Sequence, residues 1–194
     1  MRTSAPTLLP LFRSLLQGRL LAVLYAAPER ERAISELAGS LDAHVATVHR
    51  EVDRLERAGI LASRRVGRTK VVRPDLDSPF EPELSSLVLK AFGPVPIISG
   101  LLAQVPGIEE AHVFGSWAER YQGIPGAAPR DIDVLVVGRP ERDDVYRAAA
   151  EAERVTGIPV DVVIRSPEAW GRQDDGLART IRSGPHVTLD LERP

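Results

Sequence analysis

Apolar residues recur at helical spacing through the first third of the chain. A leucine-rich run between two prolines, 8–27, predicts a helix whose apolar surface is broader than one stripe. We expect it to pack within its own domain, with a second copy of the chain as an open alternative. Two shorter helices, 33–40 and 43–58, are expected on either side of a tight turn. The apolar positions of the second, expected on its buried face, are Val45, Val48, Val52 and Leu55.

A hairpin and a proline-rich segment follow. Runs 60–66 and 69–73 read as strands joined at Gly67–Arg68, because glycine permits the backbone of a two-residue turn. Five prolines between positions 74 and 96 bracket one amphipathic stretch, 83–92, which predicts a connector containing a helix. The expected divisions are a first domain at 1–74, a connector at 75–96 and a second domain at 97–194.

Helix and strand patterns alternate after the connector. Helices are expected at 97–104, 116–121, 142–156 and 167–182. Strands are expected at 111–114, 131–137, 160–164 and 187–191. Such alternation is typical of a small α/β layer structure, here with a mixed sheet.

Charge divides the chain in the same place. The 194 residues carry a net charge of -2, yet residues 1–73 hold 13 Lys and Arg against 7 Asp and Glu, whereas 74–194 hold 12 against 20. A basic domain suits a polyanion and an acidic one suits cations. The absence of cysteine excludes disulfides and thiolate metal sites. No apolar run reaches the roughly 20 residues of a membrane span and no secretory signal is recognisable, so we expect a cytoplasmic protein without a membrane partner.

Helix, turn, helix and basic hairpin together indicate a DNA-binding module. The second helix of such a module enters the major groove, and cations on a hairpin contact phosphates of double-stranded DNA. The residues expected to contact DNA are Thr47, His49, Arg50 and Arg54 on the helix and Arg64, Arg65, Arg68 and Lys70 on the hairpin.

The segment AISELAGSLDAHVATVHREVDRLERAGILASRRVGRTKVVRP resembles winged helix-turn-helix regulators of the ArsR and MarR type. The resemblance covers about the first 74 residues and implies transcription regulation. The metal-sensing residues of that family cannot be carried over, because this chain has no cysteine. A winged helix that serves only for dimerisation or protein binding, with its arginines in water, is the alternative.

Carboxylates after a glycine-serine turn are the main feature of the second half. Gly115 lets the chain turn after a strand, and Ser116 opens a helix whose amides and hydroxyl can hold phosphate. Asp131 and Asp133 are two residues apart on one expected strand, so both project from one face. Asp161 joins them if its strand is the neighbour. Three crowded carboxylates favour Mg²⁺ or Mn²⁺, whereas an isolated Asp-x-Asp pair is usually a solvated strand end.

These five residues, within HVFGSWAERYQGIPGAAPRDIDVLVVG and VDVVI, resemble minimal nucleotidyltransferases of the DNA polymerase beta superfamily. The resemblance covers about residues 107–165. It implies that Asp131, Asp133 and Asp161 are catalytic metal ligands and that Gly115 and Ser116 bind the nucleotide. The implied reaction moves a nucleoside monophosphate from a nucleoside triphosphate to an acceptor, often a protein hydroxyl.

The long loop 117–130 departs from that pattern, as does Glu119-Arg120, where small members have Arg-Gly. The sequence therefore predicts an α+β protein of two domains, a winged helix-turn-helix followed by an α/β nucleotidyltransferase domain. Two other functions stay open. One is a non-catalytic transcription factor whose pocket senses nucleotide or metal, and the other is an antitoxin that acts on a partner toxin.

Overall fold

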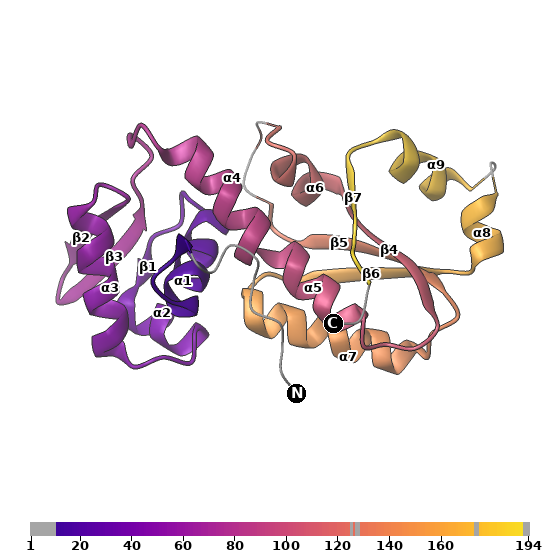
Figure 1. Cartoon of the computed structure of the whole chain (residues 1–194), viewed down its shortest axis with the longest axis horizontal. Coiled ribbons are helices and arrows are strands. Elements are labelled where there is room, and N and C mark those ends of the chain that lie inside the picture. The colour runs from indigo at the N-terminus through magenta and orange to yellow at the C-terminus, as the bar shows by residue number, and fades with distance from the viewer. Residues whose placement is uncertain (1–10, 125, 127–128, 173–174, 192–194) are drawn as a thin grey trace. The chain divides into compact units, whose positions relative to one another are not determined.

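The computed structural model describes residues 11–124, 126, 129–172 and 175–191. By its internal contacts the chain divides into two compact units, with the boundary between Gly93 and Pro94 (Figure 1). Each unit has its own sheet and its own core. The boundary between the two units lies inside the segment 75–96 that was expected to be a connector.

The first unit has the element order of a winged helix-turn-helix. Its three strands form an antiparallel sheet in the order β1-β3-β2. Gly67, with φ +60, begins the two-residue turn between β2 and β3, as the sequence predicts. The elements are α1 (Leu15–Ala26), β1 (Arg32–Ala33), α2 (Ile34–Ser40), α3 (Val45–Arg57), β2 (Leu61–Val66), β3 (Thr69–Pro74) and α4 (Glu81–Phe92).

Helix α1 is shorter and more deeply buried than its sequence pattern predicts. It begins at Leu15, where the Ser14 hydroxyl accepts a hydrogen bond from the Gln17 amide and caps the helix. The expected start near residue 8 lies outside the described residues. Every residue from Leu20 to Ala26 is buried inside the unit, and α4 packs along α1. The broad apolar surface is thus covered within the chain itself.

Gly18 explains part of the contact between α1 and α4. A side-chain carbon at position 18 would lie 2.6 Å from the Phe92 ring, so glycine lets the two helices approach. Phe12 meets the same ring edge-on, with centroids 4.8 Å apart. Helix α4, which the sequence assigned to a connector, therefore belongs to the core of the first unit.

One run of residues passes a simple test for a membrane span. By length and composition alone, Glu81–Leu102, which comprises α4 and α5 (Pro94–Leu102), could cross a bilayer. The run contains Glu81, Glu83 and Lys90, so it is not the uninterrupted apolar run that the sequence was expected to lack. Val88, Leu89 and Phe92 of this run are buried in the first unit, and Ile98 and Leu102 are buried in the second, whereas Leu87 is exposed.

The second unit is a mixed four-stranded sheet in the order β6-β5-β4-β7, with helices on its faces (Figure 1). Strands β5 and β6 are parallel and joined by α7, whereas β4 is antiparallel to both β5 and β7. The elements after α5 are β4 (Ile108–Phe114), α6 (Gly115–Tyr121), β5 (Ile132–Gly138), α7 (Arg142–Thr156), β6 (Val160–Arg165), α8 (Pro167–Gly171), α9 (Gly176–Ser183) and β7 (His186–Thr188).

The expectation of one C-terminal helix at 167–182 is wrong, because this segment forms two helices, α8 and α9. Ser166 caps α8 by accepting from the Ala169 amide, and Asp175 caps α9 by accepting from the amides of Leu177 and Ala178. The second cap starts a new helix. Ile181 of α9 then packs on Leu135 and Val137, so this segment covers the face of β5 on which Asp133 also lies.

Candidate functional site

The exposed face of α3 carries three of the residues expected to contact DNA. Val48 and Val52 are fully buried and fix the opposite face of the helix toward the core. His49 and Arg50 are therefore exposed, and Thr47 is half-buried beside them, its hydroxyl 3.4 Å from Arg50 Nη2. The expectation that Val45 is buried is wrong, since its exposed fraction is 52%.

Arg54, which was expected to contact DNA, forms an ion pair with Glu51 of the same helix. Its Nη1 donates to Glu51 Oε2 at 2.7 Å, and the Glu51 side chain is only 11% exposed. Removing a partner from a largely buried carboxylate is costly, so this pair holds Arg54 to the helix. His49 also has an acidic neighbour, because its Nδ1 lies 3.0 Å from Asp53 Oδ2.

Lys70 joins β3 of the hairpin to α3. Its Nζ lies 2.8 Å from both Asp53 Oδ1 and Glu56 Oε2, and Glu56 also accepts from the Ser63 hydroxyl at 2.6 Å. The hydrogen bond from Lys70 lowers the pKa of Asp53, and hydrogen bonds from Lys70 and then Ser63 lower the pKa of Glu56. Lys70 is thus neutralised by two carboxylates of α3, which argues against its expected role in binding phosphate.

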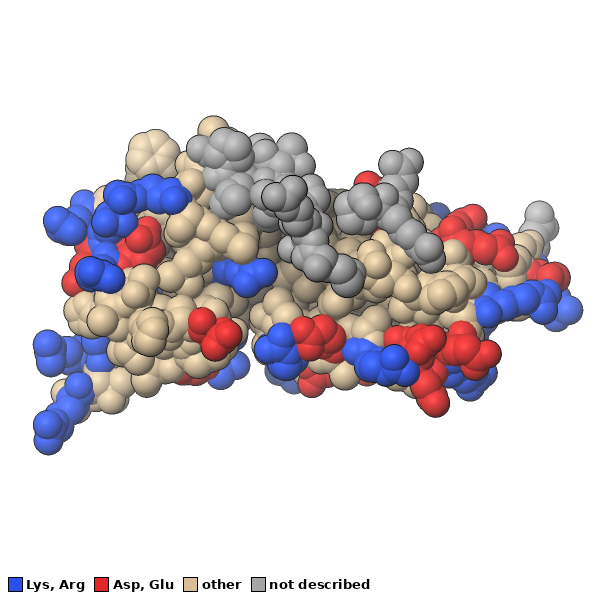
Figure 2. Space-filling model, turned by 60° about the horizontal axis from the view of Figure 1, so that its bottom comes forward, with Lys and Arg blue, Asp and Glu red and all other residues tan. Residues whose placement is uncertain are grey.

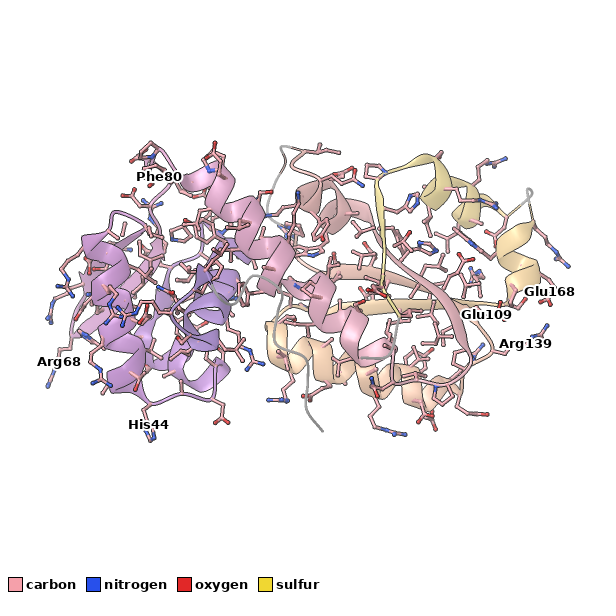
Figure 3. The ribbon with its side chains drawn as sticks, in the orientation of Figure 1. His44, Arg68, Phe80, Glu109, Arg139 and Glu168 are labelled. Atoms are coloured by element: carbon pink, nitrogen blue, oxygen red, sulfur yellow. The ribbon has the colours of Figure 1, made fainter. Side chains whose placement is uncertain are left out.

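Arg64 is also paired. Its Nε and Nη2 donate to the two oxygens of Glu31, each at 2.6 Å, and this hydrogen bonding lowers the pKa of Glu31. Arg65 and Arg68 are exposed, and in the described part of the chain neither forms a salt bridge. Arg68 points away from the hairpin in Figure 3, and Figure 2 shows cations gathered over the end of the molecule that β2, β3 and α3 form. Among the arginines and the lysine expected to contact DNA, Arg50, Arg65 and Arg68 are exposed and form no salt bridge in the part of the chain that the structure describes.

The carboxylates of the second unit come together through the register of its sheet. Asp133 of β5 is directly paired with Asp161 of the parallel strand β6, so both lie on the same face. Asp131 precedes β5 rather than lying within it. Burial, and next the charges of Asp131 and Asp161, raise the pKa of Asp133. The strand of Asp161 is thus the neighbour of the strand of Asp133, which was the condition for Asp161 to join the other two acids.

Gly115 lies close to the carboxylate of Asp133. Its neighbour Phe114 pairs with Asp133 across β4 and β5, and Gly115 has φ +68. A side-chain carbon at position 115 would lie 2.7 Å from Asp133 Oδ2, so glycine is needed both for the turn and for the close approach of this carboxylate. Ser116, at the start of α6, is exposed.

A pocket of about 300 Å³ opens beside Ser116 and Asp131. Two arginines, Arg120 and Arg130, line it together with Ile124. Guanidinium groups are a side-chain type that binds phosphates well, and here two of them line a pocket that Asp131 also lines. Arg130 was not among the residues expected from the sequence to belong to this site. Its position directly before Asp131 is the signal that could have found it.

The donor chemistry of the acids suits a hard divalent cation. The three aspartates supply only carboxylate oxygens, and within the described ranges none of them forms a salt bridge. No group of three or more acidic or imidazole side chains among the described residues is close enough together to hold an ion. The ligand type therefore fits Mg²⁺ or Mn²⁺, while a complete three-carboxylate ligand set is not assembled.

Comparisons with known proteins concern the first unit most directly. The family model HVO_A0114 matches residues 17–77. Of the solved structures, MepR, a transcription regulator of the Staphylococcus aureus multidrug efflux pump MepA, is 21% identical with a TM-score of 0.37, and the match covers 44% of this chain and 62% of that one. The homodimeric winged helix-turn-helix DNA-binding domain of Mb0332 from Mycobacterium bovis, a possible ArsR-family regulator, is 20% identical with a TM-score of 0.31, covering 46% and 88%. A search of curated proteins gives no match.

Proposed function

We propose that this protein is a DNA-binding transcriptional regulator. One observation carries the proposal, namely that Arg50, Arg65 and Arg68 are exposed on the second helix of the helix-turn-helix and on its hairpin. The second helix of this motif fits the major groove, and exposed cations beside it release counterions from the phosphates. Three neighbouring cations instead form ion pairs with acids of the same unit and stabilise its fold. They are Arg54, Arg64 and Lys70.

Salt-dependent binding of the full chain to duplex DNA tests this function. The slope of the logarithm of affinity against the logarithm of salt changes by about 0.9 for each phosphate that the protein no longer neutralises. Replacing Arg65 and Arg68 by alanine should therefore flatten the slope by about 1.8. The matched control is Arg142→Ala with Arg147→Ala, two exposed arginines of α7. An unchanged slope in the hairpin variant would remove these residues from the interface.

A second function, nucleotidyl transfer, is favoured by the carboxylate row. We infer that Asp131, Asp133 and Asp161 bind Mg²⁺ or Mn²⁺ and a nucleoside triphosphate, with the Ser116 hydroxyl on a phosphate. The supporting observations are the sheet register that pairs Asp133 with Asp161 and the close approach of Asp133 to the Gly115 turn; burial, and next the charges of Asp131 and Asp161, raise the pKa of Asp133. When bound, the metal would stabilise negative charge on the triphosphate and the leaving group.

The proposed reaction is an in-line displacement at the α-phosphorus. An acceptor oxygen forms the new P–O bond and loses its proton, while the bond to the β-phosphate breaks and pyrophosphate leaves. The chain would orient the phosphates with Ser116 and with the arginines of the neighbouring pocket, Arg120 and Arg130. The structure does not identify the acceptor; if the chain is an antitoxin, a hydroxyl of the partner toxin would be the acceptor.

Calorimetry and a transfer assay test this second function separately. ATP should bind the wild-type protein in Mg²⁺ and bind poorly without it, because the acids repel the triphosphate. Asp161→Asn should lose the Mg²⁺-dependent binding of ATP. Asp143→Asn, at an exposed acid of α7, is the control and should keep it. Transfer is followed with labelled nucleoside triphosphates and cell extract as the source of acceptor. Metal-dependent binding without transfer would assign the site to nucleotide sensing, and equal binding without metal would contradict the assignment.

A further inference from the structure

The first turn of α3 presents apolar side chains to solvent on the helix that also carries the exposed Arg50. It consists of Val45, Ala46 and Thr47, all of which end in methyl groups, and it contains no acid. Val45 is 52% exposed, although Val48 and Val52 on the same stripe are fully buried. The helix therefore extends one turn beyond the core and presents a branched apolar side chain to solvent.

Exposure of this valine calls for a partner, because burying its apolar surface against another apolar group is favourable. The surroundings indicate what that partner is. Arg50 lies on the same helix, and the exposed Arg65 and Arg68 lie on the hairpin that Lys70 fastens to it. Together these cations select a polyanion, so the apolar group must belong to a nucleic acid. In the major groove the C5 methyl of thymine is the apolar group that a base edge offers.

Val45 is also at the right place along the helix. The N-terminal residues of a recognition helix contact base edges, whereas later turns lie beside the backbone. His44, which precedes the helix, is exposed and points away from the unit in Figure 3, so the chain before the helix leaves this end open. The neighbouring side chains that can form hydrogen bonds, Thr47 and Arg50, lie within hydrogen-bond distance of each other.

We propose that Val45 recognises a thymine methyl group in duplex DNA and so contributes to the choice of operator. The inference rests on the proposed DNA-binding function. It predicts sensitivity to the methyl itself rather than to the hydrogen-bonding pattern of the base. Uracil, which pairs like thymine but lacks the methyl, should be rejected at the contacted position.

The experiment begins with selection of duplexes from a random library by the full-length protein. The enriched duplex is then synthesised with deoxyuridine in place of thymidine at each position in turn. At one position or more, wild-type affinity should fall about fourfold, which corresponds to about 0.8 kcal/mol for one buried methyl. Val45→Ala should bind the thymine and uracil duplexes equally there, and Val45→Ile should keep the preference.

Val66→Ala is the matched control. Val66 is 49% exposed, close to the value for Val45, but it lies at the tip of β2 in the hairpin. This variant should keep the full preference for thymine over uracil. All three changes are at exposed positions, so the fold should be retained, and far-UV circular dichroism checks this.

The two proposals fail in different ways. If the wild-type protein enriches no duplex, the DNA-binding function itself is wrong. If it enriches a duplex but tolerates uracil at every position, or if Val45→Ala keeps the same ratio of affinities as wild type, DNA binding stands and thymine recognition by Val45 is overturned. A preference that only Val45→Ala removes supports the proposal.

Discussion

Lys70 of β3 and Asp53 of α3 form an ion pair of 2.8 Å that joins the hairpin to helix α3. Glu56, one turn further along α3, accepts from the same ammonium group at 2.8 Å. Lys70 is only 20% exposed, so water does not replace these contacts easily. Lys70 therefore orients the hairpin, whereas Arg65 and Arg68 are exposed and available for the proposed contact with DNA.

The first prediction compares Lys70 with Arg68. Arg68→Ala should make the salt dependence of DNA binding less steep by about 0.9, because the protein then neutralises one phosphate fewer. Lys70→Ala should leave that slope nearly unchanged, since Lys70 is already neutralised by Asp53 and Glu56. It should instead weaken binding at every salt concentration, because the hairpin is no longer held to α3. Fluorescence anisotropy with a labelled duplex, at salt concentrations from about 50 to about 200 mM, measures both quantities. A slope that changes equally in both variants would mean that Lys70 contacts phosphate.

The second prediction concerns the pH dependence of the same ion pairs. The pKa values of Asp53 and Glu56 are lowered from 3.8 and 4.5 by Lys70. A carboxylate with a lowered folded-state pKa stabilises the fold above its unfolded pKa, and this contribution is lost as pH falls through the folded value. Wild type should therefore be more stable than Lys70→Met at neutral pH, and the difference should shrink below about pH 4. Thermal melting followed by far-UV circular dichroism measures it. A difference that does not vary with pH would indicate that packing of the lysine stem, rather than its charge, stabilises the hairpin.

The third prediction is a gain of DNA affinity. Glu31→Gln should weaken the ion pair of Arg64 and release a guanidinium that is already 62% exposed. Binding to duplex DNA should tighten, and its salt slope should become steeper by about 0.9. Glu29→Gln is the control, because Glu29 is an exposed acid two residues away and its change alters net charge equally. If Glu31→Gln and Glu29→Gln gain DNA affinity to the same extent, the gain comes from the change in net charge. Arg64 would then not bind phosphate after loss of its partner Glu31.

Much of the fold follows from residue spacing. The buried stripe of Val48, Val52 and Leu55 predicts α3, and the turn at Gly67 predicts the hairpin. The spacing of apolar residues along a helix does not show where the core ends, and for this reason Val45 was expected on the buried face although it is exposed. It also does not reveal a second helix cap such as Asp175, which divides the expected C-terminal helix in two. These are consequences of tertiary packing and of local hydrogen bonds that compete with helix propagation.

The sites were predictable to different degrees. The pairing of Asp133 with Asp161 required only that two predicted strands be neighbours, and they are. The partners of Lys70 and Arg64 could not be inferred, because their acids lie 14 to 33 residues away in sequence and on other elements. A count of basic residues therefore overestimated the surface available to DNA.

The fourth prediction uses the raised pKa of Asp133. An acid whose pKa is raised in the fold destabilises it as pH rises above the unfolded value, so Asp133→Asn should stabilise the second unit at pH 7. The gain should vanish as pH falls below about 4, where the aspartate is protonated. Both tryptophans, Trp117 and Trp170, belong to the second unit, so their fluorescence reports the unfolding of that unit alone. Asp143→Asn, in an exposed part of α7, should change stability little. A less stable Asp133→Asn at pH 7 would mean that the carboxylate charge is compensated.

The fifth prediction concerns the turn at Gly115. Alanine at this position must adopt φ near +68 and place its side-chain carbon 2.7 Å from Asp133 Oδ2, so both strain and overlap should destabilise the second unit. Gly157 provides the matched control, because it has φ +70 but would meet nothing within 4 Å. Gly157→Ala should therefore cost about 1 kcal/mol for the left-handed backbone alone, and Gly115→Ala should cost clearly more.

Urea denaturation followed by tryptophan fluorescence gives both free energies of unfolding. The excess cost at Gly115 is attributed to Asp133 by a double-mutant cycle, in which Asp133→Ala removes the atoms that a side chain at position 115 would meet. The two changes together should cost less than the sum of their separate costs, by about 0.5 kcal/mol or more. Equal costs for the two glycines, or strict additivity in the cycle, would show that the turn needs only its backbone conformation and that the approach of Asp133 to Gly115 is not what selects glycine there.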